Sequence, residues 1–280
     1  MSVFLYLVSM KFVALFLALS GAVHAGINCS NETVCIKAQN SSKGITLSVL
    51  IKRRAPVTVD LSIKTKNAQI RWLNKASETY NKQGEYPLAV ITPVNSSKGW
   101  NYNYRYYYQR GSLYAKHDSS YVYLLPVKTN LPVRVTQGFG GQFSHQAHDY
   151  FAVDLDVPTG TPILAARAGR VVAVKEDSNK GGPYLKFAKD GNYVAVLHDD
   201  QTIASYFHLK QNGASVKEGQ QVKRGQLLGY SGNTGFSTVP HLHFVIQSTK
   251  NGKEKRSHVF KMKSGEQVRE SFKAGDFIKP

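Results

Sequence analysis

Two histidines separated by one residue are the first candidates for chemistry in this sequence, at His241-Leu242-His243. Alternate residues of a β-strand face the same side, so both imidazoles would share one face. In such a pair, one ring can bind a metal ion while its neighbour exchanges a proton. The pair alone fits this interpretation, and it also fits two surface histidines with satisfied hydrogen bonds.

Three aspartates and two more histidines lie in residues 144–158. Asp154 and Asp156 alternate with apolar residues, which would place both carboxylates on one face of a strand. His208 lies near the end of another apolar run, residues 205–209. One carboxylate, two neutral imidazoles and an open fourth position make a catalytic zinc site. Taken alone, the two aspartates also fit a solvated strand face.

A compact β domain is needed to position these side chains. Short runs rich in Val, Ile, Leu and Tyr alternate with glycines over residues 125–250, which predicts an antiparallel β domain. Residues 251–280 form a basic tail with one helical candidate, residues 266–274, where Val268 and Phe272 are four positions apart. The expected fold class is therefore mainly β, with a domain boundary near residue 125.

Residues 26–124 also have the sequence of strands, with apolar runs at 45–51 and 57–63, and predict a β-sandwich-like domain. Five aromatic residues then alternate with polar residues, which places the rings on one strand face. Such a stripe is typical of the core face of a sandwich, although it could also stack against sugars. The five residues are Trp100, Tyr102, Tyr104, Tyr106 and Tyr108.

Residues 1–25 have the pattern of a secretory signal peptide, with Lys11, an apolar stretch and small residues before a cut at Gly26. The alternative is an uncleaved anchor, but Lys11 interrupts the apolar region. Cys29 and Cys35 follow the cut and predict a local disulfide, with metal binding as the alternative. We therefore expect a soluble, periplasmic or extracellular protein without a stable membrane anchor.

The formal net charge of +18 favours an anionic partner, such as a nucleic acid, anionic lipid or anionic cell wall. The positive charge is spread over both predicted domains and forms no single stripe. We therefore expect no nucleic-acid partner. With 42% hydrophobic and 19% charged residues, the chain can bury a core and is not a disordered polymer.

Four segments together resemble the LytM/lysostaphin-type zinc endopeptidases of bacterial cell walls, over roughly residues 122–250. Each segment alone would be weak, and their order and joint presence carry the resemblance. The segments are GFGGQFSH (138–145), AVDLDVPTGTPILAARAGRVV (152–172), SYFHL (205–209) and GQQVKRGQLLGYSGNTGFSTVPHLHFVI (219–246).

The resemblance implies a role for each matching residue. His145, Asp154 and His243 match the metal ligands of the family, so one Zn²⁺ ion is the implied cofactor. His208 and His241 match its two catalytic histidines that do not bind the metal. The implied reaction is hydrolysis of peptidoglycan crosslinking peptides by a zinc-activated water, with a histidine as general base.

One departure from the family pattern concerns the aspartate. The common spacing His-x-x-x-Asp occurs literally at His145 and Asp149. However, the family aspartate stands four residues before the turn Pro-x-Gly-Thr-Pro, which begins here at Pro158 and selects Asp154. We therefore interpret residues 146–152 as containing a short insertion, with His148 and Asp149 in a loop. The alternative makes Asp149 the ligand.

Two other functions compete with the enzyme. A catalytically silent protein of the same fold could bind the wall and activate other hydrolases, although such relatives typically lose ligand positions that are all present here. The segment VKEGQQVKRGQLLG (216–229) resembles half of a biotinyl or lipoyl carrier domain, but no lysine stands at the required hairpin. The N-terminal domain is expected to be regulatory or to position substrate, and wall binding, partner docking and inhibition all fit. The sequence leaves the cleaved bond and the oligomeric state open.

Overall fold

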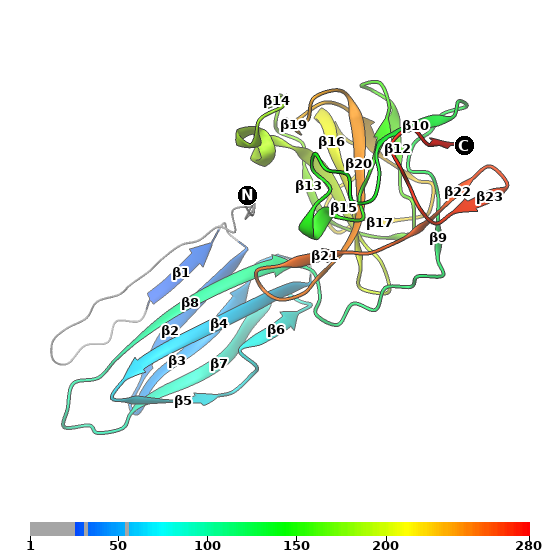
Figure 1. Ribbon diagram of the computed structural model, residues 1–280. Helices are drawn as coiled ribbons and strands as arrows, with labels where there is room; N and C mark the ends of the chain where they lie inside the picture. Colours follow the sequence, from blue (N-terminus) through cyan, green and yellow to red (C-terminus); the bar gives the residue numbers. More distant parts are fainter. Residues whose placement is uncertain (1–25, 31–32, 54–55) are drawn as a thin grey trace. The chain divides into compact units, whose positions relative to one another are not determined.

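The computed structural model describes residues 26–30, 33–53 and 56–280 (Figure 1). The predicted signal peptide, residues 1–25, lies outside the described residues. Throughout the described ranges the regular structure is β-strand, apart from two short 3₁₀ helices, and the mainly β prediction is confirmed. The chain divides into two compact units. Unit 1 comprises the described residues up to Leu113 together with Thr249–Glu254, and unit 2 comprises Tyr114–Ser248 and Lys255–Pro280.

Unit 1 is a sandwich of two sheets. The strands are β1 (Gly26–Ser30), β2 (Val34–Ser41), β3 (Gly44–Ile51), β4 (Val57–Lys66), β5 (Ala68–Trp72), β6 (Ser77–Tyr80), β7 (Gly84–Pro93) and β8 (Asn101–Arg110). One sheet has the order β1-β2-β3-β7-β5 and the other the order β6-β4-β8. In the second half of β4, exposed residues alternate with partly buried ones, as expected for a strand with one face toward a core, whereas β3 is buried or partly buried throughout.

The core of unit 1 joins apolar side chains from both sheets, including Leu47 from β3 and Val59 from β4. The five alternating aromatic residues, four in β8 and Trp100 just before it, are partly buried and pack against this core. Their interpretation as the core face of a sandwich is therefore confirmed. The predicted disulfide is also present, joining Cys29 to Cys35 across the β1–β2 pairing.

Unit 2 contains the remaining elements. They are β9 (Val122–Tyr123), β10 (Val133–Gln137), η1 (Ala147–Asp149), β11 (Val153–Asp156), β12 (Pro162–Leu164), β13 (Gly169–Lys175), β14 (Gly181–Gly182), η2 (Leu185–Asp190), β15 (Asn192–Leu197), β16 (Ile203–Ala214), β17 (Gln221–Val222), β18 (Leu227–Ser231), β19 (Gly235–Phe236), β20 (His241–Thr249), β21 (Lys255–Ser257), β22 (Lys261–Ser264), β23 (Gln267–Arg269) and β24 (Phe277–Ile278). The last residue of β20 belongs to unit 1.

The main sheet of unit 2 has the order β17-β13-β15-β16-β20-β11-β10-β24. β20 lies between β16 and β11, and all nine of its residues are buried (Figure 1). Leu155, Leu242 and Phe244 point from these strands into the core. The centre of the sheet is thus a rigid support for polar side chains on its other face.

The helix expected over residues 266–274 is wrong. The segment instead starts with β23, which pairs with β22 in a hairpin. Gly265 lies in the turn with φ +59°, a left-handed conformation that glycine adopts without strain. Phe272 is buried in the core of unit 2 whereas Val268 is exposed, so the two residues do not form one helical face. The hydrogen bonds of the hairpin outweigh a helical pattern carried by only two apolar residues.

No helix within residues 26–30, 33–53 or 56–280 has the length and apolar character required to cross a bilayer.

Candidate metal centre

The pairing of β11 with β20 brings the aspartates and the histidine pair together. Asp154 lies directly opposite His243, and Asp156 lies directly opposite His241. Directly opposite residues face the same side of a sheet. The intervening leucines pack into the core on the other side. The face predicted from each strand alone is therefore shared by both strands.

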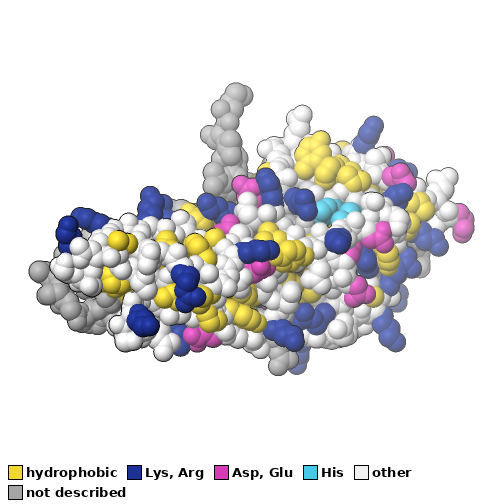
Figure 2. Space-filling view, turned by 90° about the horizontal axis from the view of Figure 1, so that it is seen from below, with side chains coloured by type: hydrophobic (Ala, Val, Ile, Leu, Met, Phe, Trp, Pro, Cys, Tyr) yellow, Lys and Arg dark blue, Asp and Glu magenta, His cyan; other side chains and the backbone are white. Residues whose placement is uncertain are grey.

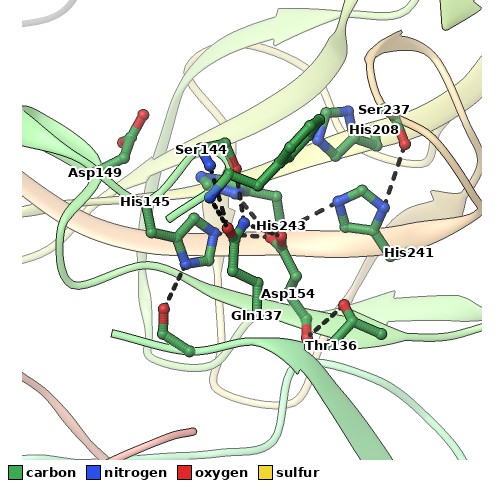
Figure 3. Close-up of polar contacts among 12 residues, drawn as sticks. Thr136, Gln137, Ser144, His145, Asp149, Asp154, His208, Ser237, His241 and His243 are labelled. Atoms are coloured by element: carbon green, nitrogen blue, oxygen red, sulfur yellow. Dashed lines mark hydrogen bonds and ion pairs between the residues drawn. The ribbon is translucent and has the colours of Figure 1, made fainter. Parts of the chain in front are cut away.

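His145 reaches the same place from the loop between β10 and η1 (Figure 3). Its Nδ1 donates to the carbonyl oxygen of Gly138 at 2.7 Å. In a neutral imidazole this leaves the lone pair on Nε2, which lies 3.1 Å from Asp154 Oδ1. Nδ1 of His243 lies 2.9 Å from the same oxygen. Asp154 Oδ1 is thus the point at which three segments of unit 2 meet.

These three residues suit a metal ion. Their potential ligand atoms lie within 4.8 Å of one another, and all three residues are buried. Two imidazoles and one carboxylate are a donor set of catalytic zinc sites. Burial acts to raise the pKa of Asp154, but the adjacent His145 and His243 imidazoles, which can donate to the carboxylate when a proton sits on the facing nitrogen, hold that pKa well below its ordinary value of 3.8. The carboxyl group is therefore ionised, as a metal ligand must be.

His208 and His241 lie next to this group, with ring centroids 4.5 Å apart. His208 has φ +66°, which is uncommon for a residue with a side chain. It follows Phe207, which lies opposite His243, so a regular strand would point the His208 ring to the core side. The left-handed residue interrupts the strand and turns the ring toward the other histidines. Strained residues of this kind cluster at functional sites.

A single loop, residues 232–240, orients both of these rings. Nδ1 of His208 donates to the Thr234 carbonyl at 2.7 Å, and Nδ1 of His241 donates to the Val239 carbonyl at 2.8 Å. Each neutral ring therefore keeps its lone pair on Nε2, and Nε2 of His241 lies 3.7 Å from Asp154 Oδ1. Burial lowers the pKa of His241, and burial together with the neighbouring imidazoles lowers that of His208 to about 3. Both rings are thus neutral proton acceptors.

Buried polar contacts fix the loop itself. The Asn192 backbone N–H donates to Thr234 Oγ1 at 3.0 Å, and this hydroxyl donates to the Leu209 carbonyl at 2.7 Å. Asn192 is fully buried. The ring of Phe236, in β19, stacks on the exposed ring of Phe143, with centroids 5.1 Å apart. Figure 2 shows histidine side chains reaching the surface beside a group of hydrophobic side chains.

The structure does not bring Asp149 into the group of potential ligands. Asp149 ends η1 and accepts a hydrogen bond from Gln247 Nε2 at 2.7 Å. His148 Nε2 lies 3.4 Å from the other carboxylate oxygen of Asp149. The geometry therefore favours Asp154 over Asp149 as the ligand. Asp156 shares the face of Asp154 but is exposed.

Sequence reasoning missed several polar residues of unit 2. Gln137, at the end of β10, contacts Asp154 directly, and only its position next to the segment 138–145 offered a signal. His117 and His258 stack on each other with ring centroids 4.7 Å apart. His198 begins the turn after β15 and is buried there.

Comparisons with known proteins show what this part of the chain is similar to. Residues 148–257 match the family model described as Peptidase family M23. Unit 2 contains a peptidase M23 domain. The resemblance to LytM/lysostaphin-type endopeptidases is thereby confirmed.

Two curated relatives illustrate the similarity of the M23 domain. The peptidoglycan DD-endopeptidase ShyA of Vibrio cholerae is 34% identical over 149 residues, which cover 50% of this chain and 31% of ShyA. Lysostaphin of Staphylococcus simulans is 38% identical over 96 residues, which cover 34% of this chain and 17% of lysostaphin. The chain thus spans less than a third of the length of these relatives. The solved catalytic domain of S. simulans lysostaphin is 28% identical, with a TM-score of 0.33, over 46% of this chain and 88% of that domain.

Proposed function

We propose that this protein is an exported, zinc-dependent endopeptidase that hydrolyses peptide crosslinks of bacterial peptidoglycan. The observation that carries the proposal is the convergence of His145 and His243 on Asp154, with His208 and His241 alongside. The names of the relatives, which include a peptidoglycan endopeptidase, support the substrate class. A chain that only bound the wall would have no use for two further oriented imidazoles.

The residues present fit a zinc ion, which His145, Asp154 and His243 would hold. Zinc in such a site polarises a carbonyl and acidifies a bound water, to a pKa of about 7. His208 and His241 supply the proton chemistry, because the Nδ1 hydrogen bonds leave both Nε2 atoms as acceptors. One ring takes a proton from the attacking water. The other ring stabilises the charge that develops on the carbonyl oxygen when it carries a proton on Nε2 and donates a hydrogen bond to that oxygen.

Export is supported by two features. The sequence pattern of residues 1–25 is that of a secretory signal. The Cys29–Cys35 disulfide suits an oxidising compartment outside the cytoplasm. Without residues 1–25, and so without Lys11, the formal net charge of +18 falls to +17, which would concentrate the protein at anionic wall polymers.

The direct test is digestion of purified peptidoglycan by residues 26–280, with the products separated by mass. Wild type should release crosslink fragments, whereas His243→Ala and a chelated sample should not. His117→Ala is the matched control, because His117 lies in the same unit outside the group of candidate ligands. A wild type that binds zinc and releases no fragments points to a silent wall-binding protein that activates other hydrolases.

For unit 1 we propose a regulatory or substrate-positioning role. Residues 249–254 belong to this unit, and Gln109 Nε2 donates to the Lys253 carbonyl at 3.0 Å. A chain of residues 114–280 therefore loses the contacts of that loop, and zinc binding must be measured to check its folding. Peptidoglycan digestion by this chain should differ from that by residues 26–280. Equal rates at equal zinc content would contradict the role.

A further inference from the structure

We infer that Gln137 is a positioning residue that holds Asp154 in the orientation needed to bind the metal. The inference rests on the proposed function, because it takes Asp154 as a ligand. It is carried by a strand irregularity, by the hydrogen bonds of one amide group and by the close approach of a glycine.

A β-bulge places Gln137 beside Asp154. β10 pairs with β11 at Val135↔Leu155 and next at Gln137↔Asp154, so two steps along β10 match one step along β11. A regular ladder would set Thr136 opposite Asp154. The extra residue brings Gln137 onto the face of Asp154 instead. Bulges often redirect a side chain in this way next to active sites.

The amide nitrogen of Gln137 occupies one oxygen of the aspartate. Nε2 donates to Asp154 Oδ2 at 2.9 Å and to Ser144 Oγ at 2.7 Å. The two histidine ligands contact the other oxygen, Oδ1 (Figure 3). The carboxylate therefore has one oxygen held by the protein and one directed at the centre. A hydrogen bond of this kind limits rotation of the carboxylate and restricts it to one ligand atom.

The amide oxygen of Gln137 fixes the amide orientation. Oε1 accepts hydrogen bonds from the backbone N–H groups of Phe143 at 3.0 Å and Ser144 at 3.1 Å. If the amide were flipped, its NH₂ group would face these two N–H donors and no hydrogen bond could form. Only the observed orientation therefore allows the amide to bond to all of its partners. Ser144 immediately precedes His145. Gln137 thus ties the loop that carries one ligand to the carboxylate of another.

Gly141 covers the side chain of Gln137. A Cβ at Gly141 would lie within 3 Å of three side-chain atoms of Gln137, the closest being Cγ, and must displace that side chain. The backbone of Gly141 is not in the left-handed region, so alanine is permitted by its φ. Gly141→Ala therefore offers a way to displace the Gln137 amide without removing it.

The test measures metal binding in Gln137→Ala by competition with a chromophoric chelator, and the absorption spectrum of the Co²⁺-loaded protein. Loss of such an outer contact typically weakens metal binding about 10- to 100-fold, and we expect a loss in this range. The Co²⁺ spectrum should also change, because the carboxylate is free to rotate or to bind through both oxygens. A general loss of packing would not alter the ligand geometry in this way.

Gln247→Ala is the matched control. Gln247 is a buried glutamine of the same unit, and its Nε2 also donates to a carboxylate, that of Asp149. Zinc affinity and the Co²⁺ spectrum of this variant should equal those of wild type. If Gln137→Ala keeps the wild-type affinity and spectrum, or changes no more than Gln247→Ala, the inference is overturned. If wild type itself binds no zinc, the proposed function fails instead.

Gly141→Ala gives a second, independent measurement. Alone, it should change zinc affinity and the Co²⁺ spectrum in the same direction as Gln137→Ala. In the Gln137→Ala background it should have little further effect, because the side chain that it displaces is gone. Equal effects of Gly141→Ala in both backgrounds would show that it acts elsewhere and would overturn the role of Gln137.

Discussion

The two units differ in the polar side chains that they bury. In the described residues of unit 1, the buried polar side chains are serines and threonines. Unit 2 also buries ionisable and amide side chains. These are His145, Asp154, Asn192, His198, His241, His243 and Gln247.

This difference indicates that unit 1 has a structural role and that the reactive groups lie in unit 2. A buried hydroxyl needs only one or two hydrogen-bond partners. The Thr58 hydroxyl, for example, is hydrogen-bonded to the Thr79 hydroxyl and donates to the Gly111 carbonyl. Burying ionisable groups costs much more unless they pair with one another. Unit 2 accepts this cost chiefly where the groups converge on Asp154, and also at His198, which lies outside that group. Substitutions in unit 2 should therefore act mainly on metal binding and activity, and substitutions in unit 1 mainly on stability.

The largest effect is expected for Asp154→Asn, which keeps the shape of the side chain and removes its charge. The centre loses its anionic ligand, and zinc binding should fall below detection by chelator competition. Hydrolysis of peptidoglycan should fall with it, by at least about 10³-fold, since both the zinc-activated water and the organised site are lost. Asp149→Asn should keep at least half of the wild-type activity. The reverse pattern would make Asp149 the ligand.

A core substitution in unit 1 should have the opposite profile. Leu47 is fully buried, and Leu47→Ala should lower the free energy of unfolding of unit 1 by about 2–5 kcal/mol through the cavity that it leaves. Zinc affinity should stay within a factor of two of wild type. Urea unfolding measures the free energy of unfolding, and chelator competition measures the zinc affinity. A large loss of zinc affinity here would break the division between the two units.

His198 extends the comparison to pH. Burial lowers its pKa from 6.5 to about 4, so between these values the unfolded chain binds more protons than the folded chain. Stability therefore falls as the pH drops from 7 toward 4, and this residue contributes up to about 3 kcal/mol of the loss.

The variant His198→Asn isolates that contribution, because it keeps an N–H donor near the Ala168 carbonyl that His198 Nδ1 contacts at 2.9 Å. Urea unfolding of the metal-free proteins at pH 7 and pH 4 should show a smaller difference in the variant. Other buried histidines titrate in both proteins and cancel in the comparison. Equal pH dependence of variant and wild type would be evidence against a buried, neutral His198.

The smallest effect is expected for the disulfide of unit 1. The loop between Cys29 and Cys35 is short, so the disulfide removes little conformational freedom from the unfolded chain. It should therefore add only about 2 kcal/mol to the free energy of unfolding. The double variant Cys29→Ser/Cys35→Ser should lose about this much stability in urea and keep its zinc affinity. A change in zinc affinity would again link the two units more closely than the comparison allows.

The sequence predicted which residues come together at the site better than it predicted how their side chains are oriented. The periodicity of two strands was enough to place Asp154 and His243 each on one face, and the structure sets them directly opposite each other. The turn at Pro158 favoured Asp154 over Asp149, and the geometry agrees. The orientation of His208 could not be predicted, because it depends on one left-handed residue with no sequence signal.

Backbone features that local patterns do not reveal also explain why the role of Gln137 was missed and why a helix was expected over residues 266–274. The bulge that brings Gln137 to Asp154 adds one residue to a strand, and the alternation of polar and apolar residues does not reveal it. The hairpin at Gly265 replaced an expected helix because its partner strand, β22, lies earlier in the chain and supplies the hydrogen bonds. Local patterns thus identified the strands and the reactive residues, whereas pairing partners decided how those residues were aimed.

The most direct test of the central claim is a titration of the metal-free protein, residues 26–280, with zinc while release of crosslink fragments from peptidoglycan is followed by mass. The account predicts that activity rises linearly and reaches its maximum at one zinc ion per chain, and that Asp154→Asn stays inactive throughout. Full activity of wild type before zinc is added, or of Asp154→Asn after it, would contradict a zinc endopeptidase centred on Asp154.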